Sequence, residues 1–164
     1  MRWMMLAAPL VLAACGGPTP EEEEAARQAA VAEVEANQKP PPEQLELDPI
    51  RYAEIEKYEL YGMGCSFTPD GGGLGTVALA QDDKGYLIRK DELLIHAADL
   101  GSKELPYGAR RKYDGRKFSF TLDLDEGSRQ DSGIETSDYR GELTVRDGDD
   151  RVVYQAKGPV QCGA

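Results

Sequence analysis

The sequence has little histidine and cysteine, the residues that zinc sites mainly use. Its 164 residues include one His and three Cys, which is too few for a zinc cluster with the usual ligand spacing. Basic residues are also in the minority, because 19 Lys and Arg stand against 30 Asp and Glu, for a formal net charge of −11. Proteins bind nucleic acid largely by neutralising phosphates with Lys and Arg. We therefore expect no nucleic-acid partner.

The N-terminal segment 1–14 has the features of an export signal. Arg2 precedes an apolar stretch of about a dozen residues. This stretch is shorter than the roughly 20 apolar residues that a membrane-spanning helix needs. It ends in small residues, as cleavable signal peptides do. We therefore expect these residues to be removed during export.

The residues Leu12-Ala13-Ala14-Cys15 at the end of this signal resemble the lipobox of bacterial lipoproteins. The resemblance implies cleavage before Cys15, diacylglycerol on its sulfur and acylation of the new N-terminus. Two or more acyl chains anchor a protein stably, whereas one chain binds only reversibly. Gly16 follows, rather than the Asp that marks inner-membrane retention in many Gram-negative lipoproteins. The resemblance thus implies a membrane anchor at Cys15, in the outer membrane and facing the periplasm.

Residues 15–50 are predicted to form a tether between this anchor and a folded domain. Positions 16–50 contain no aromatic residue and have nine acidic against two basic side chains, a composition that cannot form a core. Thr19 is a suitable N-cap, Pro20 suits the first helical position, and four Glu follow where the helix dipole favours anions. We expect a solvated helix as far as Gln38. The prolines 40–42 would then end the helix and stiffen the spacer.

Residues 51–164 are predicted to form the folded domain, because all eight Tyr and all three Phe lie in them. The clearest strand pattern covers 117–125, where apolar and polar residues alternate strictly. Hairpins are expected around the turns 82–85, 90–92 and 147–150. Short strands with turns every eight to twelve residues favour a mainly β fold, a small antiparallel β-barrel or sandwich.

Three segments of the domain lack such a pattern. Residues 50–61 fit neither the helical nor the strand period cleanly. The polar segment 126–138 is expected to be a long mobile loop between two strands. The Gly-rich segment 70–75 is expected to connect two other strands. Because loops often carry function, 70–75 and 126–138 are candidate ligand-contacting loops.

Cys65 and Cys162 form an even pair once Cys15 is lipidated, and an even pair in an exported protein predicts a disulfide. Cα atoms that a disulfide joins lie within roughly 7 Å of each other. The first and last segments of the domain should therefore be neighbours, as in a closed or nearly closed antiparallel sheet. The alternative, a nucleophilic or redox Cys, lacks a C-x-x-C motif.

No catalytic, cofactor or metal site is predicted. His96 has the pattern of a strand residue without a visible nucleophile–base–acid set. Ser66 lacks the final Gly of the G-x-S-x-G elbow, and segment 70–75 lacks the Gly-Lys-Ser/Thr continuation of a P-loop. A calcium loop that began at Asp123 would need Glu at its twelfth position, where this chain has Ile134.

The sequence therefore predicts a monomeric, non-enzymatic lipoprotein whose β-domain binds a protein or an envelope ligand. Three further hypotheses stay open. The acidic build and the disulfide are similar to those of the membrane-bound lysozyme inhibitors, and an acidic surface would steer cationic lysozyme. Segment 107–113 is the nearest match to that family's pattern of Ser-Gly before a basic residue and Tyr, although it lacks the Ser. The second hypothesis is an envelope scaffold, and the third is an envelope-remodelling enzyme with paired carboxylates.

Overall fold

The computed structural model describes residues 19–38, 40–71, 73 and 75–164. They form two units, of which the first extends to Pro41 and the second covers Pro42–Ala164. The predicted signal 1–14 and Cys15 lie outside the described residues. None of the described helices is long and apolar enough to cross a membrane.

The first unit contains one helix, α1 (Pro20–Gln38), whose described side chains are all exposed. The Glu22 N–H donates to Thr19 Oγ1 over 3.3 Å, and the Thr19 N–H donates to Glu22 Oε2 over 2.7 Å. This reciprocal pair is a capping box, which satisfies N–H groups at the start of the helix. The helix begins and ends where the sequence predicted.

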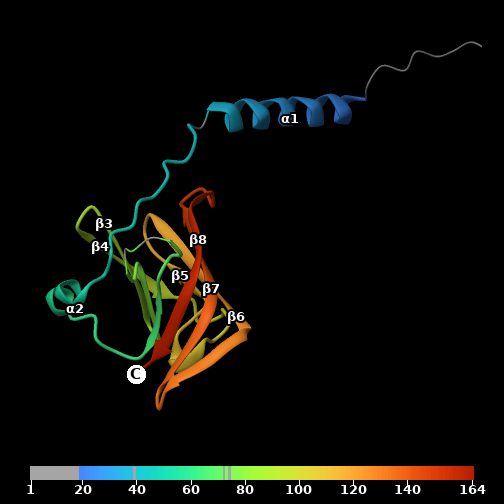
Figure 1. Cartoon of the computed structure of the whole chain (residues 1–164). Coiled ribbons are helices and arrows are strands. Elements are labelled where there is room, and N and C mark those ends of the chain that lie inside the picture. The colour runs from blue at the N-terminus through green and yellow to red at the C-terminus, as the bar shows by residue number, and fades with distance from the viewer. Residues whose placement is uncertain (1–18, 39, 72, 74) are drawn as a thin grey trace, which may run out of the picture. The chain divides into compact units, whose positions relative to one another are not determined.

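The second unit is a closed eight-stranded antiparallel β-barrel (Figure 1). The predicted fold class is therefore confirmed, and a barrel is found rather than a sandwich. Each strand pairs with its neighbours in sequence, and β8 pairs back with β1. The strands are β1 (Gly64–Phe67), β2 (Ala78–Gln81), β3 (Lys84–Arg89), β4 (Glu92–Ala98), β5 (Lys112–Asp114), β6 (Phe118–Gly133), β7 (Thr136–Asp147) and β8 (Val152–Gly163). Two short helices, α2 (Tyr52–Tyr58) and η1 (Pro106–Gly108), lie in the connections.

The barrel interior holds the main apolar core. Phe120 and Leu122 of β6 face Leu143 and Val145 of β7 in register, and all four are buried. The residues between them are less buried, as expected when side chains alternate between the two faces of a strand. The alternation predicted for 117–125 is confirmed, and β7 shows the same pattern.

The barrel unit begins at Pro42, so the prediction that the domain starts at residue 51 was wrong. Leu45 and Leu47 belong to the main core. The Leu45 N–H donates to the Val153 carbonyl over 2.8 Å, which attaches this segment to β8. The two leucines stand in an acidic stretch without aromatic residues, so composition alone assigned them to the tether.

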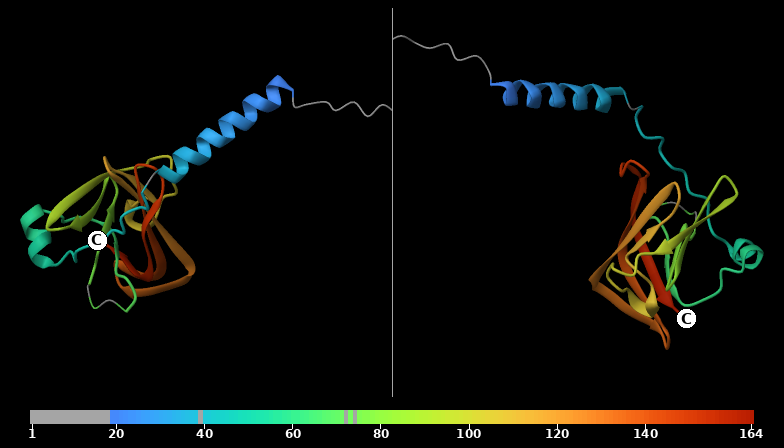
Figure 2. Two further views of the ribbon diagram at one scale, coloured as in Figure 1. Left: turned by 90° about the horizontal axis from the view of Figure 1, so that it is seen from above. Right: turned by 180° about the vertical axis from the view of Figure 1, so that it is seen from behind.

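Helix α2 occupies the segment without a clear period and covers the outer face of β3. Figure 2 shows α2 outside the wall of strands. Tyr86 and Ile88 of β3 are buried although they alternate with core-facing residues. They pack with Ile50 and Leu60 in a second apolar cluster outside the barrel. The segment that contains α2 is therefore part of the folded unit.

The prediction of a long loop over 126–138 was wrong, because β6 and β7 continue through most of it. The hairpin turns at Ile134 and Glu135, and pairing resumes after an irregularity at Gln130↔Asp138. Polar bonds replace apolar burial here: the Arg140 N–H donates to Ser128 Oγ over 2.7 Å. Of residues 126–138, only Ser137 is buried, and it is polar, so the sequence shows no apolar alternation.

The Cys65–Cys162 disulfide joins β1 to β8. The two residues pair directly in the strand register, with Cα atoms 4.0 Å apart. The predicted pairing and the predicted contact between the first and last strands are confirmed.

Candidate binding groove

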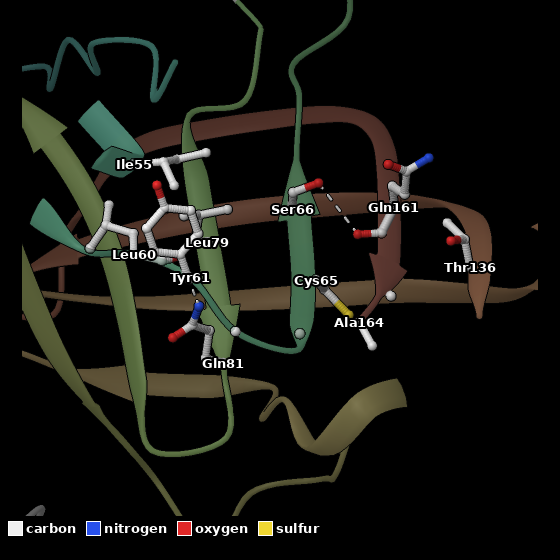
Figure 3. Close-up of a pocket in the computed structure, with 13 residues that line it drawn as sticks. Ile55, Leu60, Tyr61, Cys65, Ser66, Leu79, Gln81, Thr136, Gln161 and Ala164 are labelled. Carbon is white, nitrogen blue, oxygen red and sulfur yellow. Dashed lines mark hydrogen bonds between the residues drawn. The ribbon is translucent and has the colours of Figure 1, made fainter. Parts of the chain in front are cut away.

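A groove of about 400 Å³ lies on the outside of the barrel, where β1 pairs with β2 and β8 (Figure 3). We call it the Tyr61 groove. One side is formed by α2 and the segment that leads from it to β1. The other side is formed by the start of β7 and the end of β8. The lining residues are Ile55, Leu60, Tyr61, Gly62, Gly64, Cys65, Ser66, Leu79, Gln81, Thr136, Gln161, Gly163 and Ala164.

The backbone of β1 explains why a hollow forms here. A Cβ atom on Gly64 would lie 2.2 Å from the Ala80 carbonyl oxygen, so only Gly allows the two strands this close approach. Cys65 and Phe67 point into the core, and Ser66 faces the groove. Small residues thus form much of the groove floor.

The polar groups of the groove are amides and hydroxyls. Ser66 Oγ donates to the Gln161 carbonyl over 3.4 Å, as Figure 3 shows. Gln81 Nε2 donates to the Leu60 carbonyl over 3.2 Å. Among the described residues that line the groove, none has a carboxylate, an amine, a guanidinium or an imidazole side chain, although 30% of the chain is charged. The groove therefore suits a ligand without net charge.

Large exposed side chains stand around the groove. Tyr61 in its wall is 60% exposed, and Met63, one residue before β1, is 57% exposed. Tyr52 of α2 is also exposed, and the Glu56 carboxylate beside its hydroxyl raises the pKa of Tyr52, with burial and a hydrogen bond to Tyr61 as smaller causes. Tyr and Met are enriched in protein interfaces, whereas Lys, Glu and Asp are depleted. These side chains give the groove the composition of a contact surface.

The candidate residues Ser66, His96 and Asp123 from the sequence lie apart in the structure and do not form a catalytic site. Ser66 lies in the groove, and His96 is 2% exposed inside the barrel. Asp123 pairs with Arg111 on the barrel surface. Asp70, at the start of the Gly-rich segment between β1 and β2, forms an ion pair with Arg140, and this partner lowers the pKa of the Asp70 carboxyl.

Segment 107–113 is the one that matched the lysozyme-inhibitor pattern. Its second Tyr, Tyr113, is not exposed to a partner. Tyr113 is buried, stacks on Phe120 with ring centroids 4.7 Å apart, and donates its O–H to the Gln81 carbonyl over 2.6 Å. Burial raises the pKa of Tyr113 to about 12. This Tyr therefore supports the core.

Sequence reasoning missed the groove because its residues come from four separate segments. Only the short run Tyr61-Gly62-Met63-Gly64 carried a local signal. In this run a Gly follows each of the two large residues, directly before a strand. Gly allows an irregular backbone, and such a backbone exposes Tyr and Met, which are common contact residues.

Among the residues that the structure describes, no group of three or more His, Cys, Asp or Glu is placed to hold a metal ion. No known protein family, curated protein or solved structure matches the chain.

Proposed function

We propose that this protein is a lipoprotein, anchored at Cys15 in the outer membrane and facing the periplasm, whose barrel binds a protein ligand without catalysis. The observation that carries the binding proposal is a groove whose described lining has no charged side chain, with an exposed Tyr and Met beside it. The anchor rests on the sequence Leu12-Ala13-Ala14-Cys15.

The chemistry of the groove favours an extended, uncharged stretch of polypeptide. Gln81, Gln161 and Ser66 carry side-chain groups of the kind that pair with backbone N–H and C=O groups. Ile55 and Leu79 supply apolar surface between them. A charged segment would lose water here without gaining an opposite charge, which costs free energy.

Peptide selection tests the groove. A phage-displayed library of random 12-residue peptides is selected on the full-length protein in detergent, and the enriched peptides are titrated by calorimetry. We expect enriched peptides with few charged residues. The double variant Tyr61→Ser/Met63→Ser should weaken their binding by at least about tenfold, because exposed aromatic and Met contacts near an interface centre carry much of its energy.

Leu100→Ser is the matched control, because Leu100 is also strongly exposed but lies outside the groove. It should bind the selected peptides like the wild type. Unchanged binding by the Tyr61/Met63 variant would show that the groove is not the site. Binding of soluble peptidoglycan fragments in the groove, with no peptide enriched, would replace the protein ligand by an envelope ligand.

Acylation is tested separately in a bacterial host. Cells labelled with radioactive palmitate should incorporate the label into the wild type and not into Cys15→Ser. The variant should also leave the membrane fraction, since the acyl chains supply the membrane affinity. Equal labelling and equal membrane partitioning of the two proteins would refute the anchor.

A further inference from the structure

One seam of the barrel is paired over only a short distance. On one side, β4 pairs with β3 along its length, from Arg89↔Glu92 to Lys84↔Ala97. On the other side it meets the three-residue strand β5 only through Ala97 and Ala98. Residues 92–96 of β4 therefore have no strand partner on this side among the described residues.

The hairpin geometry decides which backbone groups lie on this open edge. The β3–β4 turn consists of Lys90 and Asp91, both with positive φ, as in the two-residue turns whose flanking residues form a hydrogen-bonded pair. Hydrogen-bonded pairs alternate along an antiparallel ladder. Glu92 therefore bonds to β3, and the N–H and C=O groups of Leu93 and Ile95 point away from β3. The same alternation places the Asp99 N–H on the side away from β3. In agreement, this N–H donates to the carbonyl of Lys112 in β5.

A cleft of about 460 Å³ runs beside this edge, and we call it the β4 cleft. Its first wall is β4 from Glu92 to His96, and its second is Arg116, Lys117 and Phe118 at the β5–β6 turn. Ile95 is 56% exposed in the first wall. The Nδ1 atom of His96 is buried and has no hydrogen-bond partner among the described residues. The Nδ1 atom faces the barrel interior, so the hydrogen-bonding capacity that the cleft offers is that of the β4 backbone.

The second wall carries two positive charges, against the single carboxylate of Glu92 in the first wall. Arg116 and Lys117 form no ion pair within the described part of the chain, whereas the nearby Arg110, Arg111 and Lys112 each pair with an acidic side chain. Arg116 and Lys117 are thus two adjacent cations in a chain of net charge −11. They would attract an acidic partner to the cleft.

We propose that the open edge of β4 binds an extended acidic peptide segment of another protein, which adds a strand between β4 and the β5–β6 turn. Backbone groups of Leu93 and Ile95 pair with the added strand, as in other complexes formed by strand addition. Side chains on one face of the strand contact Ile95, and acidic side chains meet Arg116 and Lys117. This site is separate from the Tyr61 groove, so the two proposals stand or fall independently.

The probe is an end-blocked octapeptide of alternating valine and aspartate, titrated into the ¹⁵N-labelled full-length protein in detergent. We expect binding by fluorescence anisotropy, together with slower hydrogen exchange of the Leu93 and Ile95 amides. The variant Arg116→Glu/Lys117→Glu should bind at least about tenfold more weakly, which is about 1.4 kcal/mol. Lys157→Glu, a charge reversal of an exposed cation on β8, is the matched control and should bind like the wild type.

Two further peptides separate strand addition from simple charge attraction. An alternating valine and lysine octapeptide should bind more weakly than the acidic one, and N-methylation of the acidic peptide on alternate amides should abolish binding in one of the two registers. Equal binding of all peptides, or binding without protection of Leu93 and Ile95, would overturn the proposal. Concentration-dependent protection of these amides without peptide would also overturn it, because a second copy of the chain would then occupy the edge.

Discussion

At the scale of single residues, His96 has the least ordinary environment in the barrel. Burial lowers the pKa of its imidazole, and this effect outweighs the backbone groups of Gly85 and Leu94 and the charge of Asp114, which act in the opposite direction. The ring packs edge-on against Phe120, with centroids 5.1 Å apart. The folded barrel therefore keeps His96 neutral at pH values where the unfolded chain begins to take up a proton, below about pH 6.5.

We expect the free energy of unfolding to fall as the pH drops from 7.5 to 5.5. The unfolded state binds a proton that the folded state does not, so the loss is at most about 1.4 kcal/mol per pH unit. Urea unfolding followed by circular dichroism at both pH values measures it. His96→Gln should remove most of this dependence, because His96 is the chain's only histidine and carboxylates titrate mainly below this range. A wild type equally stable at both pH values would contradict the prediction.

At the scale of elements, the segment around α2 makes β3 a strand that is buried on both faces. Ile88 is 2% exposed although it lies on the outer face, because Ile50 and Leu60 cover it. If residues 42–60 were only a tether, this outer face would be solvated and a truncation there would cost little.

Ile88→Ala should lower the free energy of unfolding by about 2–4 kcal/mol, through lost apolar burial and a cavity under α2. Ile134→Ala is the matched control, because Ile134 is fully exposed at the β6–β7 turn, and it should change stability by less than about 0.5 kcal/mol. Chemical denaturation of both variants makes the comparison. A similar effect of the two substitutions would mean that α2 does not hold its place on β3.

At the scale of the whole molecule, the disulfide closes the barrel where β1 meets β8. The two strands also pair through four residue pairs, and the cysteines are 97 positions apart in sequence. Cross-linking so long a loop reduces the entropy of the unfolded chain, with an upper value of about 4–5 kcal/mol in the chain-entropy model. The disulfide should thus contribute to stability without determining the fold.

The variant Cys65→Ala/Cys162→Ala should unfold with a free energy lower by about 2–4 kcal/mol, and with an unchanged far-ultraviolet spectrum below its melting temperature. Substitution is preferable to a reductant because both cysteines are buried. Thermal melts of the two proteins decide the matter. An unchanged melting temperature would show that strand pairing alone accounts for closure, and a lost β-spectrum would show that the bond determines the fold.

The sequence by itself determined the elements whose signals are local. The capping residues at Thr19 and Glu22 and the prolines 40–42 set the limits of α1, because helix ends depend on nearby groups. The alternation in 117–125 identified β6, since one face of that strand packs on the core. The even pair Cys65 and Cys162 predicted which strands would meet. The signal at 1–14 and the lipid anchor at Cys15 remain predictions.

The tertiary structure decided whatever depends on distant segments. Leu45 and Leu47 joined the core only because the barrel offered an apolar surface to them. The strands over 126–138 showed no apolar alternation because Ser137, a polar residue, is the one buried residue among them. Pairing with the neighbouring strands therefore formed them. The Tyr61 groove and the β4 cleft arise where strands from separate parts of the chain end or fail to pair. Their geometry follows from barrel closure, a long-range property that local sequence patterns do not encode.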